Sequence, residues 1–289
     1  MFDTFQQRYV TVDGVSIFVR VAGVGLPLLL LHGWPQSGLM WRKIATELSQ
    51  QFTVIIPDLK GYGCSAKPPD EGGHITYSKR VMASEMVNLM QQLGHQRFAV
   101  CGHDRGARVA YRMALDHDCV SHLAVLDILP IIDHLPRIGW HGAFAAHHWF
   151  FMAQEPPVPE RMIQACAVDY ATRPLISGCK TAGAIEPEVL QDYQRSFADP
   201  AWIHASCEDY RAAVAADLDA DRDDRESGKK IECPVKVLWA QQGGLKDHDV
   251  LAIWRDWASI CSGRPLACGH YLPEELPSAV ISELGVFLS

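Results

Sequence analysis

The chain of 289 residues lacks the marks of several protein classes. Its nine cysteines are scattered without a CxxC pair, so neither a disulfide framework nor a zinc site is indicated, and a reducing compartment is expected. No apolar run approaches the roughly 20 residues that a membrane-spanning helix needs. The first residues also lack the basic and apolar regions of a secretory signal, so we expect a cytoplasmic protein with no membrane association.

Positive charge is also scarce in this chain. Lysine and arginine total 26 against 34 acidic residues, which gives a formal net charge of −8, and no basic stripe is present. This balance disfavours nucleic-acid binding. Hydrophobic residues make up 48% of the chain, enough for a sizeable core in one large or two small domains.

Seven segments have the short apolar or alternating pattern of β-strands. Helical patterns separate most of the later segments, which predicts a mostly parallel sheet flanked by helices, an α/β fold. The segments are 8–12, 15–21, 28–31, 53–56, 99–101, 123–126 and 235–239.

The strand rhythm breaks between residues 131 and 230, where apolar helical runs rich in Trp, Phe and Pro replace it. We therefore expect a core domain formed by residues 1–130 and 231–289, with a helical cap domain of residues 131–230 inserted between them. We interpret both edges of the insertion, including the charged run 217–230, as solvated connections.

The pentapeptide of residues 102–106 indicates the type of reaction. Gly102-His103-Asp104-Arg105-Gly106 fits the nucleophile elbow G-x-Nuc-x-G, lies between a strand pattern and a helix pattern, and has a carboxylate at the nucleophile position. An aspartate there is suited to attack a saturated carbon and form an ester, so carbon–halogen and epoxide carbon–oxygen bonds are the natural targets. The alternative is that Asp104 merely caps the helix that follows.

Two further motifs can complete a hydrolytic site around Asp104. The turn His32-Gly33-Trp34-Pro35 follows an early strand, so the backbone N–H groups of Trp34 and Arg105 can form an oxyanion hole. Near the C-terminus, His270 in Gly-His-Tyr-Leu-Pro follows an expected last strand and is the candidate base.

The acid that would orient this histidine has three candidates. Asp127 directly ends the apolar strand 123–126 and therefore lies at the carboxyl edge of the sheet, where active sites of such folds gather. Asp247 and Asp249 follow a later strand and could instead belong to a hydrated loop. We favour Asp127.

Arg105 and Arg108 are three residues apart at the start of the elbow helix and therefore lie on nearly one face. Guanidinium groups bind carboxylates well, so the pair can hold an anionic substrate with its α-carbon facing Asp104. The alternative is that both arginines simply neutralise Asp104 and nearby acids.

Segments across the whole chain resemble the fluoroacetate (haloacetate) dehalogenases of the α/β-hydrolase fold. The paired arginines and the His148-Trp149 pair are the specific part of this resemblance. The similar segments are 102–113, 32–36, 57–63, 124–128, 148–154 and 207–211.

The resemblance implies hydrolysis of haloacetates to glycolate and halide, with no metal or organic cofactor and a homodimeric assembly. It implies the following roles: nucleophile Asp104, base His270, acid Asp127, carboxylate ligands Arg105 and Arg108, and halide ligands His148, Trp149 and Tyr210.

The chain departs from the family at two positions, neither of which touches the proposed chemistry directly. Trp34 stands where many relatives have phenylalanine, and Lys60 stands where an arginine is expected. The His-Gly-Trp-Pro form is also common in epoxide hydrolases, which share the aspartate nucleophile and use two cap tyrosines to protonate the opening ring; Tyr170, Tyr193 and Tyr210 are candidates. A binding protein of this fold without turnover is a third alternative.

Overall fold

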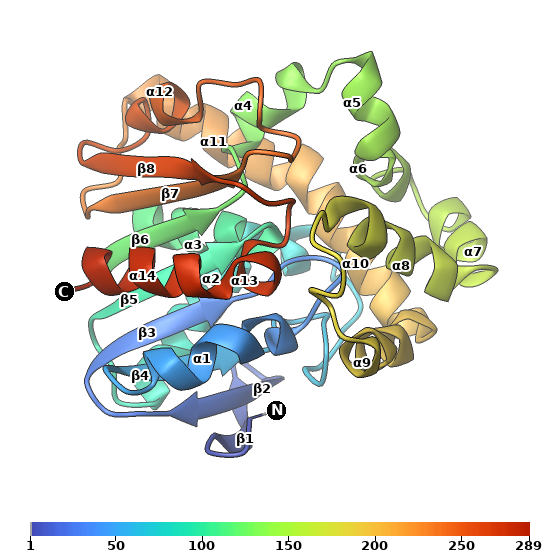
Figure 1. Ribbon diagram of the computed structural model, residues 1–289. Helices are drawn as coiled ribbons and strands as arrows, with labels where there is room; N and C mark the ends of the chain where they lie inside the picture. The colour runs from blue at the N-terminus through green and yellow to red at the C-terminus, as the bar shows by residue number, and fades with distance from the viewer. Residues whose placement is uncertain (1) are drawn as a thin grey trace.

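The computed structural model describes residues 2–289, apart from the side chain of residue 141. Within them, one eight-stranded sheet forms the centre of the molecule (Figure 1). Its strands are β1 (Gln6–Val12), β2 (Val15–Ala22), β3 (Leu26–Leu31), β4 (Phe52–Pro57), β5 (Phe98–His103), β6 (Val120–Leu126), β7 (Val235–Ala240) and β8 (Cys261–Leu266).

The sheet has the order β1-β2-β4-β3-β5-β6-β7-β8. The pairs β1–β2 and β2–β4 are antiparallel, and every later pair is parallel. Leu28 to Leu31 of the central strand β3 are fully buried, as expected for a parallel strand with helices on both faces. The prediction of a mostly parallel α/β sheet is confirmed.

All seven strand segments expected from the sequence lie within strands β1 to β7, and β8 is the last strand expected before His270. Helices α1 and α14 pack together, as do α2 and α3, and Figure 1 shows these pairs on opposite faces of the sheet. The helices of this part are η1 (Gly38–Trp41), α1 (Arg42–Leu48), η2 (Ile75–Tyr77), α2 (Lys79–Gln92), α3 (Arg105–Asp116), α12 (Val250–Arg255), α13 (Leu272–Glu275) and α14 (Pro277–Phe287).

The chain between β6 and β7 is helical. Figure 1 shows helices α5 to α10 gathered beside the edge at which the parallel strands end. These helices are α4 (Ile131–His134), η3 (Leu135–Arg137), α5 (Trp140–Ala145), α6 (His147–Met152), α7 (Val158–Gln164), α8 (Ala167–Gly178), α9 (Pro187–Phe197), α10 (Pro200–Val214) and α11 (Ala216–Ser227). We call this segment the cap.

The charged run 217–230 is not a solvated connection, and that interpretation is wrong. It forms most of α11, in which Asp217, Asp221 and Asp224 are buried. Their spacing of four and three residues places them on one helical face. That face meets positive and hydroxyl groups of the core; for example, Tyr111 donates a hydrogen bond to Asp221 at 2.9 Å.

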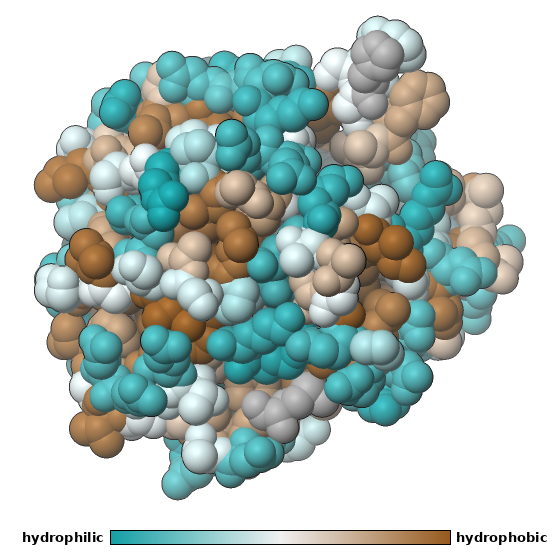
Figure 2. All heavy atoms as spheres, viewed as in Figure 1, coloured by the Kyte–Doolittle hydropathy of each residue, from teal (hydrophilic) through white to brown (hydrophobic). Residues whose placement is uncertain are grey.

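The surface mixes polar and apolar side chains, as Figure 2 shows for the face viewed in Figure 1. Several large apolar side chains of the cap are exposed, among them Trp140, Phe144 and Ile176. None of the described helices combines the length and the apolar character needed to cross a bilayer.

Candidate active site

Asp104 occupies the turn between a strand and a helix. β5 ends at His103, α3 begins at Arg105, and the backbone of Asp104 between them has φ +47°. A non-glycine residue rarely adopts this conformation, so the surrounding structure must hold it. Gly106 lets the turn close, because a Cβ at this residue would lie 2.3 Å from the carbonyl oxygen of His32.

The Asp104 carboxylate does not cap the helix. Its side chain makes no capping hydrogen bond; instead, its Oδ1 accepts a hydrogen bond of 2.9 Å from the backbone N–H of Trp34. Gly33 permits this approach, since a Cβ there would lie 2.5 Å from Cβ of Asp104. The capping alternative is therefore wrong, and the turn expected to supply an oxyanion donor does contact the carboxylate.

His270 lies between two carboxylates. Its Nδ1–H donates to Oδ2 of Asp127 at 2.6 Å, and its Nε2 is 3.8 Å from Oδ2 of Asp104. The other oxygen of Asp127 accepts a hydrogen bond of 2.8 Å from the N–H of Ala240, which fixes the carboxylate at the end of β6. His103 donates from Nε2 to the carbonyl of His270 at 2.7 Å. The structure thus brings the expected nucleophile, base and acid together.

The two competing acids lie elsewhere. Asp247 and Asp249 are both exposed in the loop after β7. Asp249 caps helix α12 by accepting a hydrogen bond of 3.1 Å from the N–H of Ala252. Of the three candidates, Asp127 is therefore the one that contacts His270.

The charges around Asp104 favour its ionised form. Burial raises the pKa of Asp104, but the charge of His270 and, more weakly, those of Arg105 and Arg108 outweigh burial and lower this pKa to about 2. Burial opposes protonation of His270, whereas its hydrogen bond to Asp127 and the charges of both aspartates favour it. The net effect raises the pKa of His270 above its ordinary value.

The two arginines differ in how they are held. Arg105 is fully buried and forms an ion pair with Asp209 of α10, using its Nε and Nη2. Arg108 donates from Nη1 to the carbonyl of Leu129 at 3.0 Å. Among the described residues, Nη1 of Arg105 and Nε of Arg108 are buried without a hydrogen-bond partner. The neutralising alternative thus applies in part to Arg105, and each arginine retains at least one donor for a ligand.

Aromatic side chains of the cap cover these guanidinium groups. The centre of the Arg105 guanidinium lies 4.2 Å from the ring of Tyr210, and that of Arg108 lies 4.6 Å from the ring of Trp149. Both contacts have the geometry of a cation–π interaction. His148 stacks on Trp34 with ring centres 4.9 Å apart. The ring centre of Tyr210 lies 5.5 Å from that of His148 and 5.3 Å from that of Trp149, so the three expected halide ligands lie together.

His148 is held as a neutral group. Burial lowers the pKa of its imidazole to about 3, and its Nδ1 is buried with no hydrogen-bond partner among the described residues. Burial also raises the pKa of Tyr210, which keeps the phenol protonated. A neutral imidazole and a phenol both supply hydrogen-bond donors for an anion without adding charge.

The three cap tyrosines are not equivalent. Tyr210 and Tyr170 both present an edge-to-face contact to Trp34, with ring centres 5.8 and 6.5 Å apart. The hydroxyl of Tyr170 is buried without a partner among the described residues. Tyr193 instead donates to Glu274 at 3.2 Å. Two tyrosines therefore remain near the site, as an epoxide hydrolase would require.

Sequence reasoning missed three groups around the site. His134 lies 5.2 Å from the ring of Trp149, and burial lowers its pKa to about 3. His103 occupies a variable position of the elbow pattern, so the pattern assigns it no role. Asp209 lies directly before Tyr210 in a segment that resembled the family, and that adjacency was the available signal.

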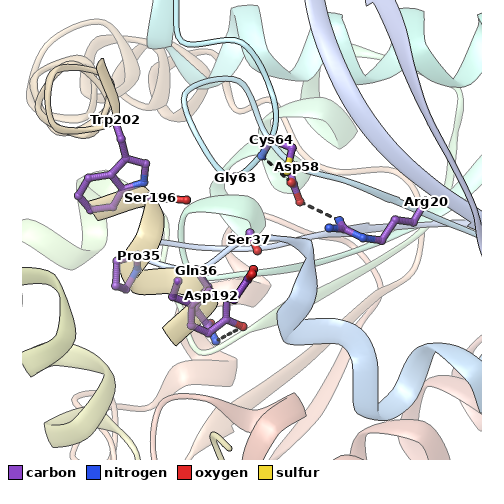
Figure 3. Close-up of a pocket in the computed structure, with 11 residues that line it drawn as sticks. Arg20, Pro35, Gln36, Ser37, Asp58, Gly63, Cys64, Asp192, Ser196 and Trp202 are labelled. Atoms are coloured by element: carbon purple, nitrogen blue, oxygen red, sulfur yellow. Dashed lines mark hydrogen bonds and ion pairs between the residues drawn. The ribbon is translucent and has the colours of Figure 1, made fainter. Parts of the chain in front are cut away.

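A separate cavity of about 40 Å³ lies beside the turn that follows Trp34 (Figure 3). Arg20 forms a buried ion pair of 3.0 Å with Asp58 at its wall, and Asp192 of the cap lines another part. Pro35 of the turn and the candidate tyrosine Tyr193 line this cavity, whereas Asp104, His270 and Asp127 do not. It is therefore distinct from the place where the chemistry is expected.

In the part of the chain that the structure describes, two groups of side chains have the composition of a metal site, and both include Glu208: Asp70 with His74, and Glu160 with His204. Arg211 donates to Glu208 at 2.7 Å and to Glu160 at 2.6 Å, which places a positive charge among these acceptors. Backbone N–H groups of residues 72, 74 and 76 already occupy the oxygens of Asp70. We assign no metal to either group.

Comparison with known proteins gives the family. The pattern of the alpha/beta hydrolase fold matches residues 27–166. A fluoroacetate dehalogenase of Burkholderia sp is 39% identical over 100% of this chain and 95% of its own length. A soluble epoxide hydrolase of Corynebacterium sp. is 32% identical over 93% of this chain and 92% of its own length.

Solved structures agree with this relationship. A proposed alpha/beta hydrolase from Nostoc sp PCC 7120 has a TM-score of 0.96 and 46% identity, covering 100% of this chain and 99% of its own. An epoxide hydrolase solved without ligand has a TM-score of 0.89 and 30% identity, covering 98% of both chains. The chain is therefore a hydrolase that belongs to the fluoroacetate dehalogenase family of the α/β-hydrolase fold.

Proposed function

We propose that this protein hydrolyses haloacetates, fluoroacetate among them, to glycolate and halide. One observation carries the proposal: the ionised Asp104 carboxylate lies 3.8 Å from Nε2 of His270 and is stabilised by the charges of two buried arginines, Arg105 and Arg108. A carboxylate nucleophile suits a saturated carbon, and the arginines suit a substrate that is itself a carboxylate. The name of the Burkholderia relative supports the same substrate class.

The first step is an in-line displacement at the α-carbon. The Trp34 N–H holds Oδ1 of Asp104, so Oδ2 is the oxygen that attacks. A carbon–oxygen bond forms as the carbon–halogen bond breaks, and the halide leaves with the bonding electron pair. His148, Trp149 and Tyr210 would stabilise the charge that develops on the halide, which matters most for fluoride because it is a poor leaving group.

The second step hydrolyses the ester on Asp104. A water molecule loses a proton to Nε2 of His270 and attacks the ester carbonyl carbon. The backbone N–H groups of Trp34 and Arg105 would stabilise the resulting anion on Oδ1. The tetrahedral intermediate collapses, and glycolate leaves with the proton returned by His270. The second proton of the water remains on Asp104, which has a pKa of about 2 and therefore releases it to solvent, so the carboxylate is restored.

Alkylation also prepares the base for this second step. The negative charge of Asp104 is one of the causes that raise the pKa of His270. Ester formation removes that charge, so the pKa of His270 should fall and a larger fraction of the imidazole becomes neutral. A neutral imidazole held by Asp127 in the Nδ1–H form can accept the proton of water at Nε2. The first nucleophile is thus a side chain and the second is water, so the scheme uses no metal or organic cofactor.

Epoxide hydrolysis is the second candidate. Tyr170 and Tyr210 both contact Trp34, and this pair supports epoxide hydrolysis because two phenols can donate protons to the opening ring. The Corynebacterium relative is named as an epoxide hydrolase. A neutral epoxide, however, offers no carboxylate to the buried arginines, so we rank it second.

The test is halide release measured by an ion-selective electrode from fluoroacetate and chloroacetate, alongside diol formation from a simple epoxide. We expect fluoride and chloride release by the wild-type protein, and none by Asp104→Ala. Chloride without fluoride would restrict the substrate to the better leaving groups. Diol formation without halide release would contradict the proposal and favour epoxide hydrolysis.

A further inference from the structure

The orientation of Arg105 depends on one residue of the cap. Its Nε donates to Oδ1 of Asp209 at 2.7 Å, and its Nη2 contacts both that oxygen and the Asp209 carbonyl, the latter at 2.6 Å. Both side chains are fully buried. Only Nη1 of the guanidinium is left, and it has no hydrogen-bond partner among the described residues. Asp209 therefore fixes which N–H of Arg105 is available to a ligand.

Asp209 is itself held from two other elements. Nζ of Lys79, at the start of α2, donates to its Oδ1 at 2.7 Å, and the hydroxyl of Tyr62 donates to its Oδ2 at 2.8 Å. Burial raises the pKa of Asp209, but the charges of Arg105 and Lys79 outweigh burial and lower it. The carboxylate is thus ionised and braced on both oxygens.

The charges of this buried cluster balance. Lys79 also forms an ion pair of 3.6 Å with Asp217, so two cations, Arg105 and Lys79, face two anions, Asp209 and Asp217. A buried ion cluster is weak support for stability, because well-packed apolar groups often serve equally well. Its location beside the reacting carboxylate makes a role in orientation the better account.

The contrast with Arg108 strengthens this account. Arg108 is equally buried, yet it donates a hydrogen bond to the carbonyl of Leu129 and pairs with no acid among the described residues. Tyr210 directly follows Asp209 on α10, and its ring lies 4.2 Å from the Arg105 guanidinium. Two consecutive residues of the cap therefore contact the Arg105 guanidinium: Asp209 binds its nitrogens and the ring of Tyr210 packs against it.

We propose that Asp209 is a positioning residue for substrate recognition. By occupying Nε and Nη2 of Arg105, it leaves Nη1 as the single donor of that side chain for the substrate carboxylate, and it couples cap helix α10 to the nucleophile elbow. This inference rests on the proposed function, because it assumes an anionic substrate.

A double-mutant cycle on kcat/KM for chloroacetate tests this role, with the wild-type protein measured first. We expect Asp209→Asn and Arg105→Gln each to lose about 30-fold or more, as when one partner of a buried charge pair is removed. If Asp209 acts through Arg105, the double variant should lie within about twofold of Arg105→Gln alone. Losses that multiply, or wild-type kinetics for Asp209→Asn, would overturn the inference.

The matched control is Asp217→Asn. It also removes one buried negative charge beside Lys79, but Asp217 does not contact Arg105. We expect its kcat/KM to stay within about twofold of the wild-type value. A loss equal to that of Asp209→Asn would mean that the cluster acts through its charge balance and would contradict a specific role for Asp209.

Folding of the variants is followed by thermal unfolding. If Asp209→Asn does not fold, Lys79→Met/Asp209→Asn replaces it, since this pair removes one charge of each sign, with Lys79→Met/Asp217→Asn as its control. The same loss in the first pair and not in the second would support the positioning role. Chloride release absent from the wild-type protein would instead contradict the proposed function, and with it the carboxylate that Arg105 is proposed to hold.

Discussion

The reacting groups on the core side of the site and the groups expected to bind the substrate satisfy their polar atoms differently. On the core side, hydrogen bonds join Asp127 to His270 and the Trp34 N–H to Asp104, so the groups expected to carry out the chemistry are held in place. By contrast, Nδ1 of His148 on the cap side, and Nη1 of Arg105 and Nε of Arg108 on α3, are buried without partners among the described residues. An unpaired buried polar group is costly, and a ligand that pairs with it removes that cost.

This difference separates two tasks. Transition-state stabilisation requires donors and acceptors that are already oriented before the reaction, and the hydrogen-bonded groups at the strand ends meet this requirement. Recognition instead gains from donors that only the substrate satisfies. The arginines differ in how they are held, because Asp209 occupies Nε and Nη2 of Arg105 whereas Arg108 donates to the Leu129 carbonyl, but each keeps one buried nitrogen unpaired.

The largest effect on recognition is expected from Arg108→Leu. Removing a buried charge that pairs with the substrate carboxylate should raise the activation free energy by about 2–5 kcal/mol. This change lowers kcat/KM for chloroacetate roughly 30-fold to several thousand-fold. Steady-state chloride release measures this effect, and Arg108→Lys, which retains the charge, should lose less. Unchanged kinetics in Arg108→Leu would favour the view that the arginines only neutralise nearby acids.

A smaller effect, graded with pH, should separate the two chemical steps. His270 must be neutral in the ester intermediate to activate water, so hydrolysis should fall about tenfold per pH unit below the pKa of His270 in that intermediate. Because the Asp104 charge is lost there, the midpoint should lie below the raised pKa of His270 in the free enzyme. The pKa of Asp104 is about 2, so its carboxylate stays ionised in mildly acidic solution and alkylation should continue there. Rapid-quench measurements at acidic pH should therefore show a burst of halide followed by slow turnover. Slow turnover without a burst would mean that acid blocks the first step.

The core side could largely be predicted from the sequence because its geometry is local. Glycines that permit a closed turn mark the elbow around Asp104, and a strand that ends directly in an acid marks Asp127. Chain order then leaves His270 as the base. In each case, a few neighbouring residues and the rule that active sites gather at strand ends carry the information.

The cap side could be predicted only by resemblance. The pairing of Arg105 with Asp209 joins residues 104 positions apart, and no local pattern encodes it. The burial of Asp217, Asp221 and Asp224 depends in the same way on distant partners such as Lys79, so a run of charges that reads as solvated forms a packed helix. Hydrophobic periodicity indicates which face of a helix is apolar, but it does not indicate which buried charges meet.

The central claim is that Asp104 forms a covalent ester that His270 resolves, and peptide mass spectrometry of His270→Ala incubated with fluoroacetate tests it most directly. Cys101 lies three residues before Asp104, so Asp104→Ala/His270→Ala is the necessary control for the site of modification. We predict that the peptide containing Asp104 gains a stable adduct in His270→Ala and none in the double variant. Fluoride release by His270→Ala without an adduct on Asp104, or an adduct that persists in the double variant, would contradict the account.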